Sequence, residues 1–99
     1  MRVHTETVAF KADQKLIAFI ERKLSKMDQF FDRIIDAQVV LKLENVGQVR
    51  DKIVEVRLNV PGNVLIAKES RKTFEASVAS AVEGLKRQLI RHKERERLV

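Results

Sequence analysis

The segment from residue 52 to residue 69 constrains the fold of this chain more than any other. It reads KIVEVRLNV-PG-NVLIAKE, with apolar and polar residues alternating around a Pro-Gly pair. Alternation with a period of two is typical of a β-strand that buries one face. Pro61 presets φ for the first corner of a tight turn and Gly62 tolerates the positive φ of the second, which predicts a type II-like turn. We therefore expect an antiparallel hairpin of two strands, 52–60 and 63–69.

Two more strands are predicted from shorter stretches of the same kind. Residues 2–9 (RVHTETVA) alternate weakly and contain several β-branched residues. Residues 36–43 (DAQVVLKL) place four apolar side chains on one face. The polar segment 44–51 (ENVGQVRD), which contains one glycine, is expected to connect this strand to the hairpin.

Two segments show helical spacing instead. Asp13 is a candidate N-cap for the first helix, and Thr73 for the second. In the first helix the apolar stripe consists of Leu16, Ile20, Leu24, Met27 and Phe31. In the second it consists of Phe74, Val78, Ala81, Val82, Leu85, Leu89 and His92. Gly84 interrupts the second helix at a cost of about 1 kcal/mol relative to alanine, which suggests a close contact there.

The predicted order of elements is β-α-β-β-β-α, an α+β fold. The helix between the first two strands is too long for a hairpin, so these strands are expected to be parallel, with a right-handed crossover. Both apolar stripes are buried if the two helices pack on one face of a four-stranded mixed sheet. The other sheet face would then be open to water and would carry Gln38, Lys42, Glu55, Arg57 and Asn59. A chain of 99 residues suits one domain, which we assign to 1–95, with 96–99 as a short charged tail.

The charge of the chain points to a polyanionic partner. The net charge is +6, and residues 71–99 hold 8 Lys and Arg against 4 Glu. Such a balance favours nucleic acid, the ribosome or an anionic membrane surface. No apolar run approaches the roughly 20 residues of a membrane span, the N-terminus lacks the layout of a secretory signal, and there is no cysteine. We therefore expect a cytoplasmic protein that does not enter a membrane.

No constellation of catalytic residues is evident. His4 lies in the first strand without an evident partner. His92 is expected at the wet end of the second helical stripe, where it covers Leu89 or stacks on a base. Two isolated histidines do not form a metal site, and the three glycines are isolated, so there is no phosphate-binding loop. The sequence predicts a non-enzyme without metal, cofactor or small-molecule substrate.

The basic residues follow lines along both predicted helices. On the second helix, Arg87 and Arg91 share one face, and Lys86, Lys93 and Arg97 form a line on the other flank of the apolar stripe. On the first helix the line consists of Lys15, Arg22, Lys26 and Arg33, with Lys23 beside it. Solvated helix faces often look like this, but two such helices side by side would form one broad positive surface.

Contacts between such a surface and nucleic acid would be made mostly to phosphate groups. Stacking on single-stranded bases is disfavoured, because the chain has no Trp or Tyr and its phenylalanines mostly serve the core. Phe19 and Phe30 are the candidates for an exposed ring. Recognition of folded RNA by its shape and phosphates is expected instead.

Several segments together resemble the family of ribosome hibernation promoting factors, also known as ribosome-associated inhibitors or sigma-54 modulation proteins. They are ERKLSKMDQFFDRIIDAQVVLKLE, VPGNVLIAKE and LKRQLIRHK, and the similarity covers about residues 1–95. The resemblance implies the same β-α-β-β-β-α fold. It also implies binding to small-subunit rRNA in the channel used by mRNA and tRNA, with inhibition of translation in stationary phase or stress.

The resemblance also suggests which residues contact rRNA. Lys23 and Lys26 match basic positions of the family's first helix. The end of the second helix, with the pattern RQL..HK, is matched by Arg87, Arg91, His92 and Lys93. We add Lys86 from its place on the basic line, and a second group from the first helical line comprises Lys15, Arg22 and Arg33.

The chain departs from the family pattern in two ways. Family members usually begin the second helix with an Asp-Met-Tyr-like sequence, whereas this chain has Thr73, Phe74 and Glu75, so any contact of that tyrosine is missing. Longer members add a C-terminal dimerisation domain, so a chain ending at Val99 resembles a short form that would not pair ribosomes without another factor. Two alternatives stay open: a general double-stranded-RNA-binding domain, and a protein that modulates a sigma factor by direct binding.

Overall fold

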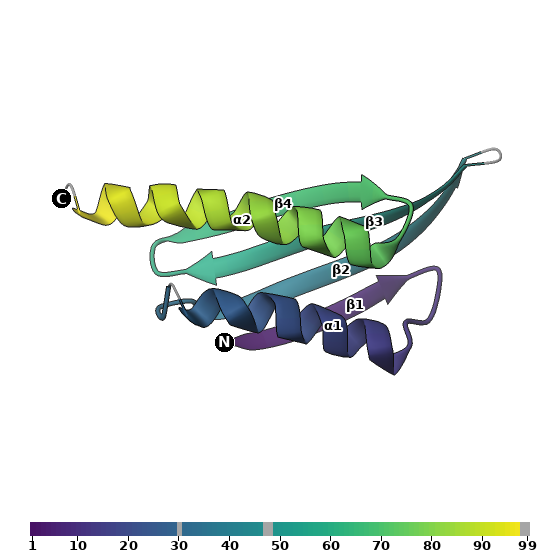
Figure 1. Ribbon diagram of the computed structural model, residues 1–99, viewed down its shortest axis with the longest axis horizontal. Coiled ribbons are helices and arrows are strands. Elements are labelled where there is room, and N and C mark those ends of the chain that lie inside the picture. Colours follow the sequence, from purple (N-terminus) through teal and green to yellow (C-terminus); the bar gives the residue numbers. More distant parts are fainter. Residues whose placement is uncertain (30, 47–48, 98–99) are drawn as a thin grey trace.

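The computed structural model describes residues 1–29, 31–46 and 49–97 (Figure 1). Its elements are β1 (Arg2–Val8), α1 (Gln14–Ser25), the 3-10 helix η1 (Lys26–Gln29), β2 (Asp36–Val46), β3 (Val49–Val60), β4 (Asn63–Arg71) and α2 (Phe74–Arg97). The four strands form one sheet in the order β1-β2-β3-β4. β1 is parallel to β2, and the other neighbours are antiparallel. The predicted α+β fold and its mixed sheet are confirmed.

Both helices cover the same face of the sheet. In Figure 1 they lie side by side in front of the strands, α1 over the β1 side and α2 over the β4 side. α1 connects the parallel strands β1 and β2, as a crossover must. The strand-to-helix connection contains Ala9, which has a positive φ of 70°.

The β3–β4 hairpin has the predicted turn. Val60 pairs with Asn63 across Pro61 and Gly62, and Gly62 has φ 79°, which the second corner of a type II turn requires. The other hairpin is longer than predicted, because β2 and β3 reach Val46 and Val49 where a polar connection over 44–51 was expected. Main-chain pairing continues there without an apolar pattern, since an antiparallel ladder does not require one buried face along its whole length.

The core lies between the helices and the covered sheet face. All five members of the first helical stripe are buried, as are all seven of the second. They meet Val39, Leu41, Val54, Val56 and Leu58, which are at most 1% exposed. The register places the residues expected on the open sheet face on the side opposite this core. Gln38, Lys42 and Arg57 are exposed, whereas Glu55 and Asn59 are half-buried.

The first helix ends earlier than its apolar stripe indicated. Asp13 caps it as predicted, with Oδ1 accepting a hydrogen bond from Leu16 N at 2.8 Å. After Ser25 the chain tightens into η1, and a turn from Phe31 N to Met27 O at 3.1 Å follows. The prediction that Arg33 continues the basic line along this helix is therefore wrong, because the chain has already left the helical path.

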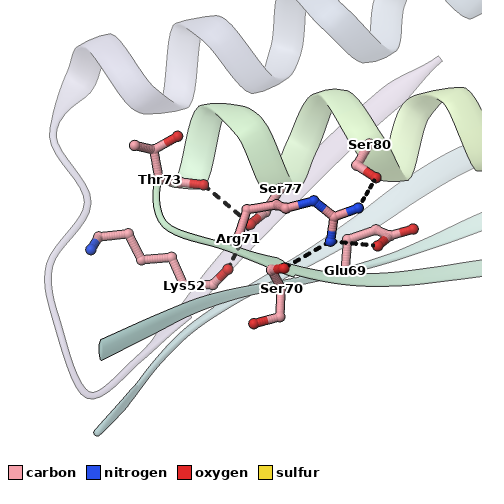
Figure 2. Close-up of polar contacts among 7 residues, drawn as sticks. All are labelled: Lys52, Glu69, Ser70, Arg71, Thr73, Ser77 and Ser80. Atoms are coloured by element: carbon pink, nitrogen blue, oxygen red, sulfur yellow. Dashed lines mark hydrogen bonds and ion pairs between the residues drawn. The ribbon is translucent and has the colours of Figure 1, made fainter. Parts of the chain in front are cut away.

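One hydroxyl group caps the start of α2, and a second bonds it to the sheet. Figure 2 shows the second bond, from Ser77 to Lys52. Thr73 Oγ1 accepts a hydrogen bond from Ala76 N at 3.1 Å, which confirms the predicted N-cap. The Oγ of the buried Ser77 donates to Lys52 O on β3 at 2.6 Å and lies 3.1 Å from Thr73 O. Phe74, beside the cap, is buried. The first turn of α2 is therefore anchored to β3 by a buried hydrogen bond.

Side chains also bond the outer edge of β4. Arg71 Nη1 donates to Ser70 O at 2.8 Å, and its Nη2 donates to Ser80 Oγ on α2 at 3.1 Å (Figure 2). Farther along, Gln88 Nε2 of α2 donates to Ile66 O at 2.8 Å. These bonds occupy backbone carbonyls of an edge strand that would otherwise be open to another strand. They also fix the rotation of α2, with Gln88 on the side of β4.

The second helix runs to Arg97. Residues 96 and 97, expected to begin a charged tail, lie in its last turn. The remaining tail residues, 98–99, lie outside the described residues. Phe30, the other candidate for an exposed ring, also lies outside them. Gly84 does not mark an unusually close contact, because a Cβ there would lie 3.8 Å from an Arg87 nitrogen and 3.9 Å from the Ala67 Cβ. No helix within the described part of the chain is long and apolar enough to cross a bilayer.

Candidate nucleic-acid interface

The basic residues of α2 lie on two different sides of the helix. Gln88 reaches β4, so the flank that includes Arg91 faces the outer edge of the sheet, and Arg91 lines a hollow with Asn63 and Val64. Lys86 and Lys93 lie on the opposite flank, toward α1. Arg87 points away from the core and is exposed. The two predicted lines exist, but the core stripe of α2 separates them.

The basic residues of α1 lie on the side of the sheet that α2 also covers. Met1 precedes β1, the edge strand, and its N-terminal amine is 2.8 Å from Asp28 Oδ2 in η1. The side of α1 and η1 that carries Asp28 therefore faces β1. The opposite flank, toward α2, carries Lys23 and Lys26. Lys15 and Arg22 are exposed on the outer side of the helix.

Phe19 supports two of these cations. Its half-buried ring packs against the core, while Arg22 Cζ and Lys23 Nζ lie 5.8 Å and 5.6 Å from its centroid. Such cation–π contacts contribute about 0.5–1 kcal/mol at exposed sites and hold the charged groups near the ring. Phe19, a candidate for an exposed ring, is thus half-buried.

We call the solvent-facing surface of the two helices, together with their facing flanks, the helical face. It is defined by Lys15, Arg22, Lys23, Lys26, Lys86, Arg87 and Lys93. Helix packing brings residues from two segments, about 60 positions apart in sequence, onto one side of the sheet (Figure 1). Cations from both helices therefore present phosphate-binding groups to the same solvent region.

Arg33 and His92 differ from the other predicted site residues. Arg33 lies outside α1, and its Nη1 is 3.3 Å from Glu96 Oε2 at the end of α2. His92 lies within the core, with its side chain only 10% exposed and its ring edge-on to Phe31 at 5.7 Å. The expectation that His92 occupies the wet end of the stripe is corrected, because Phe31 and Glu96 cover it.

The open sheet face has a different charge pattern. In the row through Glu55, the basic Lys68 lies on one neighbouring strand and the uncharged Val40 on the other. Arg57 lies 4.0 Å from Glu55 on the same strand. Acidic and basic groups are interleaved there, so the helical face is the better candidate for a polyanion.

The sequence from residue 3 to residue 97 matches the family described as "Sigma 54 modulation protein / S30EA ribosomal protein". The chain belongs to this family. The match includes both α-helices, three strands in full and β1 from its second residue, and the resemblance noted from sequence is confirmed. The description of the S30EA family names a modulation protein and a ribosomal protein rather than an enzyme, which agrees with the expectation of a non-enzyme.

Several relatives in sequence are named hibernation factors. The ribosome hibernation promotion factor of Deinococcus radiodurans is 40% identical over 78 residues, which cover 78% of this chain and 41% of that protein. The ribosome hibernation promoting factor of Klebsiella oxytoca is 36% identical and covered over 77% of its length, with 78% of this chain aligned. That of Escherichia coli K12 is 33% identical, with 83% of this chain and 82% of the relative covered. This chain thus spans less than half of the Deinococcus protein.

Two solved structures share the S30EA fold. A ribosomal subunit interface protein from Coxiella burnetii superposes with a TM-score of 0.85 at 19% identity, covering 95% of this chain and 99% of that one. The N-terminal domain of Thermus thermophilus Protein Y superposes with a TM-score of 0.81 at 24% identity, covering 93% and 99%. At such identities the likeness establishes the fold alone.

Sequence reasoning missed one charged residue beside the predicted site residues Arg33 and His92. Glu96 lies between Arg33 and His92 in the structure, whereas the sequence predicts that residue 96 begins a charged tail. The spacing of His92 and Glu96, four residues apart, is a signal for contact on a helix. The contact with Arg33 had no comparable signal, since it joins positions 63 residues apart.

Proposed function

We propose that this protein is a cytoplasmic ribosome hibernation factor. Its helical face binds rRNA of the small ribosomal subunit in the channel of mRNA and tRNA, and the bound protein inhibits translation under stress or in stationary phase. Membership of the S30EA family and relatives named hibernation promoting factors support the proposal. The structural observation that carries it is that α1 and α2 cover the same face of the sheet, so that Lys23 and Lys26 lie on the same side of the molecule as Lys86 and Lys93.

The proposed rRNA contacts are mainly electrostatic. Lysine and arginine bind phosphate oxygens without reading base sequence, so shape and charge complementarity select the site. Arg87 and Arg91 extend the contact along α2, whereas His92 is too buried to contact RNA directly in this conformation. Inhibition would be steric, because a protein in the channel excludes the natural occupants.

Competition tests this proposal. The protein is expected to co-sediment with purified small subunits and to be released by excess tRNA and mRNA, because all three would occupy one channel. A long RNA duplex of equal phosphate concentration is the control competitor and should release much less protein. Equal release by the duplex would contradict the proposal and favour the general double-stranded-RNA-binding domain.

The sigma-factor alternative requires an apolar surface for a protein partner. Val64 and Ile66 are 46% and 44% exposed on the open face of β4. Their cross-strand neighbours are Asn59 and Arg57, so the apolar residues do not form a broad patch. This alternative would be supported if the protein sedimented with a protein partner, if this binding survived nuclease treatment, and if it depended only weakly on salt.

Replacing both Arg87 and Arg91 with alanine is expected to weaken small-subunit binding about 10-fold at physiological salt, from the loss of roughly two phosphate contacts. The slope of log affinity against log salt should become shallower by about 1.5. Both side chains are exposed and alanine favours helix, so the thermal unfolding temperature should not fall. An unchanged affinity would place the RNA on the flank facing α1 alone.

A further inference from the structure

The carboxylate of Glu96 lies within a cluster of basic side chains. Its Oε2 is 3.3 Å from Arg33 Nη1, and its Oε1 is 3.2 Å from His92 Nε2. Glu96 also lines a hollow at the end of the helical face, together with Phe31, Asp32, Arg33, Lys93 and Arg97, so three cations and two carboxylates meet there. An acidic group that pairs with a cation beside a proposed phosphate-binding surface calls for a physical explanation.

The support for fold stability from this carboxylate is small. The Arg33 and Glu96 side chains are 58% and 32% exposed, and ion pairs of that kind contribute about 0–1 kcal/mol. The contact with His92 lacks hydrogen-bond geometry, so the buried Nε2 has no hydrogen-bond partner among the described residues. A buried nitrogen of this kind is ordinarily paired. Glu96 therefore lies where an anion would bind, but it leaves His92 Nε2 without a hydrogen bond.

A phosphate group suits the same position. Carboxylate and phosphate oxygens are both acceptors for the guanidinium group, and phosphate offers more oxygens and more charge. An arginine from the segment after η1, together with Lys93 and Arg97 from α2, would bring cations from two sides of the hollow. The imidazole edge lies beneath the carboxylate that a phosphate would replace.

We infer that Glu96 is an internal competitor of RNA at this hollow. In the free protein the Glu96 carboxylate pairs with Arg33. When RNA binds, one of its backbone phosphates displaces the carboxylate and pairs with Arg33 instead. The inference rests on the proposed function. It adds a phosphate-binding site in which the protein's own Glu96 competes with the phosphate. Displacement occurs only where the RNA places a phosphate at the hollow, so Glu96 penalises RNA of the wrong shape.

Two glutamate-to-glutamine variants test this role. Glu96→Gln removes the competing charge and is expected to tighten small-subunit binding about 5-fold, the factor that corresponds to an ion pair of about 1 kcal/mol. Glu94→Gln removes the same charge two residues away on the same helix, at an exposed position, and should change affinity less than about 2-fold. In an Arg33→Ala background, the gain from Glu96→Gln should disappear. Affinity is measured by co-sedimentation of the full chain across a salt series.

The outcomes separate this inference from the proposed function. If the unsubstituted protein does not bind small subunits, both fall. If it binds and the two glutamine variants gain equally, the effect is one of net charge and the competitor role is wrong. If Glu96→Gln binds more weakly, the carboxylate positions Arg33 for the RNA instead, which also overturns the inference. Thermal unfolding of each variant confirms that it is folded.

Discussion

Replacing Lys23, Lys26, Lys86 and Lys93 together with alanine is expected to weaken binding to the small ribosomal subunit at least about 100-fold at physiological salt. Each lysine lost removes a phosphate contact, and each such contact contributes a factor of several to affinity through charge and counterion release. The slope of log affinity against log salt should become shallower by about 3. Sedimentation binding at several salt concentrations measures both quantities.

The matched control removes the same charge from the opposite face. Arg2, Lys42, Arg57 and Lys68 are exposed on the open sheet face, and their replacement also lowers the net charge from +6 to +2. This variant should lose less than about 5-fold, because only the long-range field weakens and that field is screened over about 8 Å at physiological salt. If both variants lose affinity equally, RNA responds to net charge and the helical face is not the binding surface.

The failure of the lysine variant to fold would produce the same loss of binding for a different reason. These lysines lie outside the buried core cluster, and alanine has the highest helix propensity. Lys86 has one weak ion pair with Glu83 at 3.4 Å, so little stability depends on it. Lys23 also contacts the Phe19 ring, which contributes about 0.5–1 kcal/mol. Circular dichroism of the variant should therefore match that of the unsubstituted protein, and its thermal unfolding temperature should fall only slightly.

Local rules in the sequence predicted most of this fold. The turn at Gly62, the caps at Asp13 and Thr73, and the two helical stripes are each determined by neighbouring residues, and each is present in the structure. The end of α1 was misplaced because the apolar spacing continues through Met27 and Phe31 although the backbone tightens into a 3-10 turn. Hydrophobic periodicity reports which side chains are buried, and it does not distinguish these two backbone forms at a helix end.

The candidate site was less predictable than the fold. The cations of each helix could be placed on lines from sequence, but which flank of α2 faces α1 depends on packing, fixed here by the bond from Gln88 to Ile66. The pairing of Arg33 with Glu96 crosses 63 residues and has no local pattern. The sequence places His92 at the wet end of the apolar stripe, because histidine occurs both in the interior and on the surface of proteins. Its membership of the stripe correctly indicates burial.

Two adjacent residues near the end of α2 test how far the helical face depends on the core beneath it. Leu89 is fully buried and Ile90 is 52% exposed, although both are large aliphatic residues one position apart. Leu89→Ala is expected to lower the free energy of unfolding by about 2–5 kcal/mol, since the lost contacts leave a cavity between α2 and the sheet. Ile90→Ala should change it by less than about 0.5 kcal/mol. Urea unfolding measures both values, with an unchanged dependence on urea showing that the same surface unfolds.

The consequence for the interface follows from the size of that loss. A domain of this length has about 5–15 kcal/mol of stability, so Leu89→Ala removes a large fraction of it without removing a charge. Because Lys86 and Lys93 flank Leu89 on α2, their positions relative to α1 depend on this packing. Leu89→Ala should therefore weaken subunit binding near its unfolding temperature, while Ile90→Ala should bind normally at the same temperature. Equal destabilisation by both substitutions would mean that α2 is rotated from the position described here, and the assignment of its basic flanks would change with it.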